Sequence, residues 1–191
     1  MRKHLITALL YTLVTTAVVG IVYPLVITLV AQLMFQGNAN GQLISRNGVV
    51  VGSSILAQPF SSGKYFHPRP SAAGANGYDA SNSGGSNYGP TNQKLIHRVK
   101  SVTVAITAEN PPSPVPVDLV TTSASGLDPD ITPAAAAFQI PRVARARGRS
   151  EEEIRILVRA HTQARQFGFL GEPRVNVLQL NLALDEEFPQ K

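Results

Sequence analysis

The stretch "LITALLYTLVTTAVVGIVYPLVITLVAQLMF", from Leu5 to Phe35, decides the fold because it contains no charged residue. As an α-helix its 31 residues would extend about 46 Å, whereas the hydrocarbon core of a bilayer is about 30 Å thick. A cleaved signal peptide would have a shorter apolar core followed by a small-residue cleavage site, and no such site follows the stretch. The stretch therefore predicts an uncleaved transmembrane helix, with Pro24 as a candidate kink.

The charges on either side of this stretch predict the orientation of the chain. Arg2, Lys3 and the terminal amine precede it, and the first charge after it is Arg46. Because positive residues beside a span favour the cytoplasmic side, we expect a single-pass protein whose C-terminal part lies outside the cytoplasm. The expected divisions are a cytoplasmic N-terminus at 1–4, the anchor at 5–35, a connector at 36–42 and an extracytoplasmic soluble domain at 43–191.

The composition of the chain argues against nucleic acid as a partner. The sequence pI is near 9.8 and the formal charge is +5, yet without Arg2 and Lys3 the chain has 15 basic against 12 acidic residues. A mildly basic domain outside the cytoplasm does not indicate nucleic-acid binding. The absence of cysteine is neutral, since a domain of about 150 residues can bury a stable core without disulfides.

The soluble part begins with signals of a hairpin and a long loop. Residues 43–60 alternate β-branched and small side chains around Asn47–Gly48, which favours two strands joined by a tight turn. Residues 61–92 are rich in glycine, serine, asparagine and proline. A loop of this length is typically functional or disordered, and we expect it to be ordered by its aromatic residues, with Tyr88 as the anchor of "SGGSNYGPTN" (83–92).

A helix is predicted directly after the loop. Its expected N-cap is Thr91 or Asn92, and it must end by Pro111–Pro112. A strand remains the alternative, because Val102, Val104 and Ile106 also alternate. The helix is favoured by four apolar residues at intervals of four, three and four: Leu95, Val99, Val102 and Ile106.

Two further helices and a strand are predicted in the C-terminal half. Thr132–Pro133 is typical of a helix start, and Pro141 should interrupt or kink that helix. Ser150 and Glu153 form a capping box for the next helix, which Gly168 should close.

The segment "RVNVLQLNLAL" (174–184) reads as a strand with leucines at alternate positions and a bulge between Val175 and Val177. The predicted fold class is therefore α+β: one N-terminal transmembrane helix followed by a single mixed α/β extracytoplasmic domain.

No catalytic or metal site is indicated. The loop 83–92 lacks the Gly-Lys-Ser/Thr ending of a phosphate-binding loop, no Gly-x-Ser-x-Gly elbow occurs, and the histidines form no ligand pair. Asp118, Asp128 and Asp130 could serve acid–base work or hold a cation, but their contexts favour turn and helix-start roles. The arginines of "RVARARG" (142–148) and Arg149 read as a solvated helix end, with a patch for an acidic partner as the alternative.

Several blocks of the chain resemble one family. They are the N-terminal span, "YFHPRPSAA" (65–73), "SGGSNYGPTN" (83–92), "VPVDLVTTSASGLDPDITPAAA" (115–136), "RVARARG" (142–148) and "GFLGEPRVNVLQLNLALD" (168–185). In this order they are similar to the KdpC family, the C subunits of bacterial Kdp potassium-transporting ATPases, over essentially the full length.

This resemblance implies a non-enzymatic subunit of a potassium-importing pump in the cell inner membrane. Its partners would be the ion-carrying A subunit, the P-type ATPase B subunit, the small F subunit and membrane lipid. The C subunit is described in the family as needed for assembly and as a catalytic chaperone that raises the ATP affinity of the B subunit. ATP is thus a candidate cofactor through the resemblance alone. A domain outside the cytoplasm cannot touch cytoplasmic ATP, so such an effect would travel through the membrane subunits.

The leading hypothesis places the soluble domain on the outer face of the A subunit, near the ion entrance. The alternative is a membrane-tethered binding module for a peptide or cell-wall ligand. Three carboxylates are candidates for shaping cation access: Asp79, Asp118 and Asp128. The candidate partner-docking residues lie in the long loop: Tyr65, Phe66, Arg69, Tyr78, Asp79, Gly84, Gly85, Asn87 and Tyr88.

Overall fold

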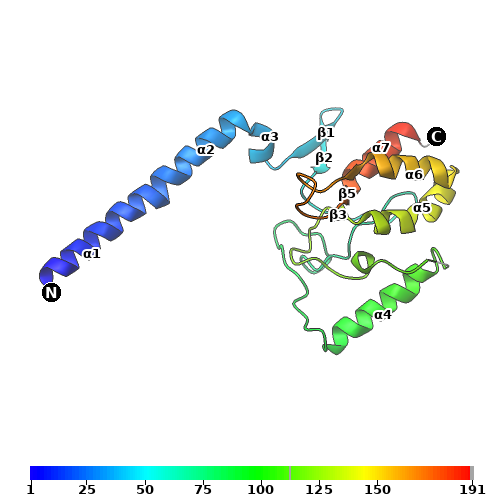
Figure 1. Ribbon diagram of the computed structural model, residues 1–191, viewed down its shortest axis with the longest axis horizontal. Helices are drawn as coiled ribbons and strands as arrows, with labels where there is room; N and C mark the ends of the chain where they lie inside the picture. The colour runs from blue at the N-terminus through cyan, green and yellow to red at the C-terminus, as the bar shows by residue number, and fades with distance from the viewer. Residues whose placement is uncertain (112, 190–191) are drawn as a thin grey trace. The chain divides into compact units, whose positions relative to one another are not determined.

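The computed structural model describes residues 1–111 and 113–189, which form two compact units (Figure 1). The first is Met1–Leu43, and the second begins at Ile44. The predicted α+β class with one N-terminal apolar helix is confirmed.

The first unit is a helix that runs from Arg2 to Met34 and is long and apolar enough to cross a membrane. It consists of α1 (Arg2–Thr15), the π-helical segment η1 (Thr16–Val22) and α2 (Tyr23–Met34), and the short α3 (Gln36–Ala39) follows. The π-helical turns end just before Pro24, which has no N–H to donate and whose ring crowds the carbonyl one turn earlier. The chain thus stays helical at this proline by widening the turns that precede it.

The second unit contains two small sheets. In the hairpin of β1 (Leu43–Arg46) and β2 (Val49–Ser53), Asn47 and Gly48 have φ of 52° and 77°, the left-handed conformation of a tight two-residue hairpin turn, which confirms that prediction. The other sheet has the order β3-β5-β4 and is antiparallel. Its strands are β3 (Asp130–Ile131), β4 (Thr162–Gln163) and β5 (Arg174–Asn176).

Four helices complete this unit, three of which surround the core. They are α4 (Gln93–Thr107), α5 (Pro133–Arg147), α6 (Glu151–Ala160) and α7 (Val177–Glu187), with the short turn η2 (Val117–Leu119) before β3. α5, α6 and α7 pack around the three-stranded sheet and bury apolar side chains such as Ile140, Leu157 and Val175. α4 lies apart from these three helices in Figure 1, and none of its residues is fully buried.

The predicted helix starts are confirmed at the level of single hydrogen bonds. The side chains of Asn92, Thr132 and Ser150 each accept from a backbone N–H in the first turn, and Glu153 completes the capping box. α4 ends at Thr107, before Pro111, while Pro112 lies outside the described residues.

Three details of the sequence prediction are wrong. Pro141, predicted to interrupt or kink its helix, does not interrupt α5, which continues to Arg147; the kink stays a prediction. Gly168 does not close α6, because the helix ends at Ala160 and the next residues pair in β4. The predicted strand over 174–184 is only three residues long and turns into α7, where Asn176 caps the helix.

The missed helix α7 has a signal in the sequence. Four of its five buried residues, Val177, Leu180, Asn181 and Leu184, follow the spacing 0, 3, 4, 7 of one helix face, and Leu178 is the fifth. The leucines at every second position obscured this spacing, because half of them also satisfy the helical period.

Two buried side-chain amides attach the long loop to the core helices. Asn181 of α7 accepts from the backbone N–H of Phe66 at 2.8 Å and donates to its carbonyl at 2.9 Å. Gln139 of α5 does the same for His67, at 2.8 and 3.1 Å. Each amide thus replaces the hydrogen bonds that a neighbouring strand would supply to buried backbone.

Replacing Asn181 by alanine should destabilise the soluble unit by about 2–5 kcal/mol, because two buried backbone groups lose their partner. Gln179→Ala is the matched control: its side chain is exposed on the same helix, and a change within about 0.5 kcal/mol is expected. Urea unfolding of the full chain in detergent, followed by circular dichroism, measures the difference. If the two variants were equally stable, the hydrogen bonds from Asn181 to the Phe66 backbone, which we call a clamp, would not contribute to stability.

Candidate functional site

The long loop, residues 61–92, is held at its start by aromatic packing. Phe66 is fully buried and lies in the core, so it can serve docking only by holding the loop in place. Tyr88, by contrast, is 39% exposed, and the expectation that it anchors the loop is wrong. The anchor is Phe66, whose backbone is clamped by Asn181.

A buried arginine holds the same part of the loop. The side chain of Arg147 has no exposed surface and donates to the carbonyls of Lys64 (2.8 Å), Leu184 and Phe188 (both 3.2 Å). It also pairs with Asp185 at 2.8 Å and lies over the ring of Tyr65. The Tyr65 hydroxyl donates to Asp185, and burial together with this carboxylate raises the pKa of Tyr65.

Arg142 plays a similar part on the preceding turn of α5. It donates to Glu109 at 2.7 Å and to the carbonyls of Gly63 and Tyr65. The view of this basic run as a solvated helix end is therefore wrong for Arg142 and Arg147, whereas Arg145 and Arg149 are exposed. The sequence does contain a signal of this burial: Ile140, Val143 and Arg147 follow the spacing 0, 3, 7 of one helix face, and this face of α5 is buried.

The rest of the loop lies on the segment Thr121–Gly126. The Ser71 hydroxyl donates to the Gly126 carbonyl at 2.6 Å and accepts from the Tyr78 N–H at 2.7 Å. The Tyr78 hydroxyl donates to the carbonyl of Arg69, and burial raises the pKa of Tyr78. The hydroxyl groups of Ser71 and Tyr78 are thus used within the soluble unit, where they hold the long loop in shape and against the segment Thr121–Gly126.

Two of the three glycines of "SGGSNYGPTN", Gly84 and Gly85, lie on this segment. Gly84 donates to the Ser125 carbonyl at 2.8 Å, and a Cβ on Gly85 would lie 2.9 Å from the Ala124 carbonyl oxygen. Gly126 has φ of +68°, and a Cβ there would lie 2.5 Å from the Gly84 oxygen. Close approach of two backbones therefore explains Gly85 and Gly126 without any phosphate.

The turn around Asn87 and Tyr88 is exposed and lies beside a shallow hollow of about 540 Å³ lined also by Asn76, Gly85 and Arg98. Asn87 has φ of +53°, a conformation that asparagine adopts more readily than most residues. Of the candidate docking residues, Asp79, Asn87 and Tyr88 are exposed. The others hold the loop in shape.

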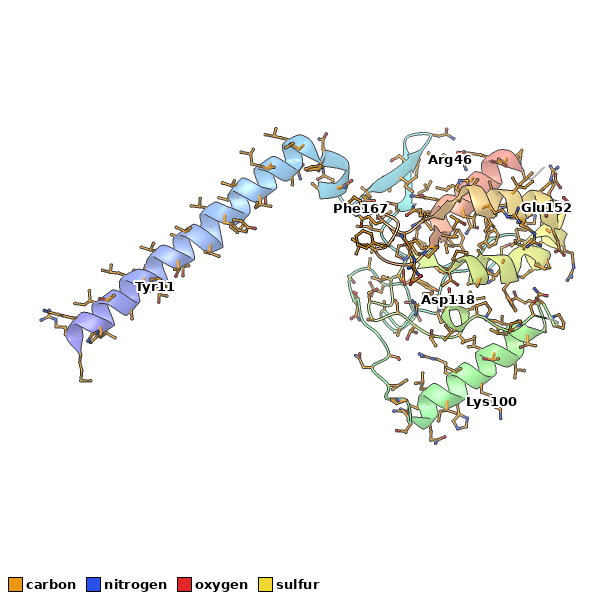
Figure 2. The ribbon with its side chains drawn as sticks, in the orientation of Figure 1. Tyr11, Arg46, Lys100, Asp118, Glu152 and Phe167 are labelled. Atoms are coloured by element: carbon orange, nitrogen blue, oxygen red, sulfur yellow. The ribbon has the colours of Figure 1, made fainter. Side chains whose placement is uncertain are left out.

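The three candidate cation-access carboxylates lie in separate local networks. Asp118, on η2 below α5 in the view of Figure 2, is buried and accepts from the N–H and hydroxyl of Thr132. Asp128 pairs with Arg69 at 3.0 Å. Asp79 accepts from the N–H and hydroxyl of Ser81, which lower its pKa.

Acidic and histidine side chains do not gather into a metal-binding group among the described residues 1–111 and 113–189. His67 is half-buried, and burial together with the nearby Arg142 lowers its pKa. Its ring Nε2 lies 3.0 Å from the Ser62 carbonyl, which is a structural contact within the loop.

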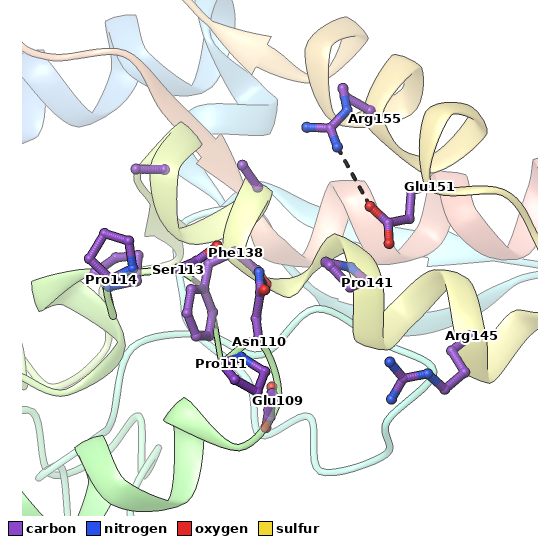
Figure 3. Close-up of a pocket in the computed structure, with 13 residues that line it drawn as sticks. Glu109, Asn110, Pro111, Ser113, Pro114, Phe138, Pro141, Arg145, Glu151 and Arg155 are labelled. Carbon is purple, nitrogen blue, oxygen red and sulfur yellow. Dashed lines mark hydrogen bonds and ion pairs between the residues drawn. The ribbon is translucent and has the colours of Figure 1, made fainter.

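Sequence inspection missed a larger hollow of about 700 Å³ between α5 and the proline-rich segment before η2. Figure 3 shows Phe138, Pro141 and Arg145 of α5 facing Pro111 and Pro114 across it. On its rim Arg155 pairs with Glu151 at 3.7 Å. The repeated prolines mark the segment in sequence, but only the fold brings it opposite α5.

A pair of glycine substitutions tests the loop-on-loop contact. Gly148→Ala is the control, because Gly148 has a similar φ of +64° and open space around it, and strain alone should cost about 1–2 kcal/mol. Gly126→Ala should cost more, about 3 kcal/mol or above, because backbone atoms must also move. Urea unfolding compares them, and equal losses would show that the contact is loose.

Comparison with known proteins assigns the chain to a family. The family model "KdpC: K+-transporting ATPase, c chain" matches residues 5–186. Proteins named potassium-transporting ATPase KdpC subunit are similar over nearly their whole length. That of Koribacter versatilis is 62% identical, covering 99% of this chain and 97% of its own. That of Rhodopseudomonas palustris is 54% identical, covering 97% and 98%. The chain therefore belongs to the KdpC family, the c chains of K+-transporting ATPases.

Proposed function

We propose that this chain is a non-catalytic subunit that holds a potassium-importing ATPase together, with the A, B and F subunits as partners. The observation that carries the proposal is the construction of the long loop, which is irregular yet tied down by buried amides, arginines and a second loop. Such a loop keeps one shape before binding, and a preorganised surface loses less entropy when it docks.

The non-catalytic role is supported by how the candidate reactive groups are used. Asp118 is committed to the start of α5, and Asp128 is paired with Arg69. In the serine-rich segment Thr121–Gly126, the Ser125 hydroxyl accepts from the N–H of Leu127. These groups have structural partners where a catalytic site would need a nucleophile beside a base.

The proposal also includes the side of the membrane on which the soluble unit lies. With Arg2 and Lys3 in the cytoplasm, the soluble unit lies on the outer side of the inner membrane, on the A subunit near the ion entrance. Of the three candidate cation-access carboxylates, Asp79 is exposed and would add negative charge near the ion path, whereas Asp118 is buried and Asp128 is paired with Arg69. Any rise in the ATP affinity of the B subunit would then be a coupling free energy carried by the membrane subunits, without direct contact with ATP.

Cysteine labelling tests the orientation, and the chain has no native cysteine to interfere. Ser83→Cys, at an exposed loop position, should react with a membrane-impermeant thiol reagent in intact spheroplasts. The matched control His4→Cys, before the span, should react only after lysis. The reverse pattern would place the soluble unit in the cytoplasm.

A substitution in the exposed turn tests docking. Tyr88→Ala should weaken retention of this chain in the purified pump about tenfold or more, because exposed aromatic residues in rigid turns are typical binding hot spots. Ile96→Ala is the control, since Ile96 is 44% exposed on α4. Retention is measured as the subunit ratio after stringent washing. Retention of both variants at the native ratio would remove Tyr88 from the interface.

A further inference from the structure

The connection between β4 and β5 carries an exposed apolar tip. Phe167, Phe169 and Leu170 are 79%, 70% and 47% exposed. We call the turn Gln166–Leu170 the aromatic tip. Large apolar side chains gathered at one exposed turn of a soluble unit mark a site of contact with a protein or a membrane.

The aromatic tip has a defined shape. Gln166 and Leu170 exchange two backbone hydrogen bonds of 2.9 Å, and Arg165 pairs with Glu172 at 2.6 Å across the base. Phe167 has φ of +54°, which is unusual for a bulky residue and persists only where the surrounding turn imposes it. The turn therefore holds its aromatic side chains outward.

The aromatic tip lies at the end of the soluble unit where the chain enters. Asn176, at the start of α7, donates to the carbonyl of Ser54, while Arg46 pairs with Glu186 near the other end of α7. The hairpin of β1 and β2 thus runs along α7. Because its strands are antiparallel, Ile44 lies at the same end as Ser54.

The strand β5 leads from the aromatic tip to that same end of α7. Figure 2 accordingly shows Phe167 on the side of the domain where β1 begins. Only residues 35–43 separate the apolar helix from Ile44, and nine residues reach about 30 Å even when fully extended. The tip therefore lies on the side of the soluble unit at which residues 35–43 join it.

We propose that the aromatic tip inserts into the headgroup and upper acyl region of the bilayer that holds the N-terminal helix. Three side chains are too few for a stable protein interface, which buries about 800 Å² per partner, but suffice for shallow insertion of a tethered domain. The carboxylates of Glu172 and Asp130 beside the tip have cationic partners, in the pairs Arg165–Glu172 and Arg174–Asp130, which reduces their opposition to insertion.

This inference rests on the membrane anchor and holds whichever pump subunits are present, so it is tested on the full chain alone. The chain has no tryptophan, and Phe169→Trp therefore introduces a single tryptophan, which can be excited selectively, with little change of shape. Ile156→Trp on α6, where Ile156 is 59% exposed, is the matched control. Each variant is reconstituted into phosphatidylcholine bilayers with and without bromine on the acyl chains.

Brominated lipid should quench Phe169→Trp strongly and Ile156→Trp little. Adding Phe167→Ser and Leu170→Ser to Phe169→Trp should lower the inserted population about tenfold or more, because two apolar side chains leave the interface. Unchanged far-ultraviolet circular dichroism shows that the variants are folded. Equal quenching of the two tryptophans would overturn the proposal. The proposal would also be overturned if the tryptophan of Phe169→Trp became shielded from water only after the other pump subunits were added.

Discussion

The soluble unit depends on a constraint of polar chemistry: an irregular segment can be buried only if its backbone N–H and C=O groups find partners. Asn181 and Gln139 meet this constraint for Phe66 and His67, and Arg147 meets it for Lys64 and for carbonyls at the end of α7. These polar side chains occupy positions that would otherwise be apolar on core helices. At the start of the loop these side chains supply the backbone hydrogen bonds that a neighbouring strand would otherwise supply.

The sequence predicted what is decided locally. The uncharged span, the Asn47–Gly48 turn and the caps at Asn92, Thr132 and Ser150 each depend on a few neighbouring residues. α7 was misread as a strand because alternating leucines fit both periods, and the tertiary environment chose the helix. The positions of Arg142 and Arg147 could not be inferred from a basic run, since their partners are about 40 to 80 residues away in sequence.

The candidate site likewise combines features that depend on neighbouring residues with features that depend on distant ones. Aromatic and glycine content predicted an ordered loop, and the structure assigns different tasks to residues that looked alike: Phe66 anchors, whereas Tyr88 is exposed. Which surface of this loop faces another subunit depends on the partner, so composition could not indicate it. Family membership supplies the partner class, and the flanking charges of the span supply the proposed side of the membrane.

The amide clamps have a consequence for how the soluble unit moves. Hydrogen bonds from two side chains hold the start of the loop, whereas α5, α6 and α7 share a continuous apolar core. Phe66 belongs to that core, so the clamped start of the loop should open only together with it. The later part of the loop, residues 71–92, is held by hydrogen bonds such as those of Ser71 and Gly84, and its amides should exchange with solvent deuterium through a cheaper, sub-global opening while core amides wait for complete unfolding. The unit thus combines a slowly exchanging helical core with a separately opening surface layer, and a bound partner would slow exchange in that layer first.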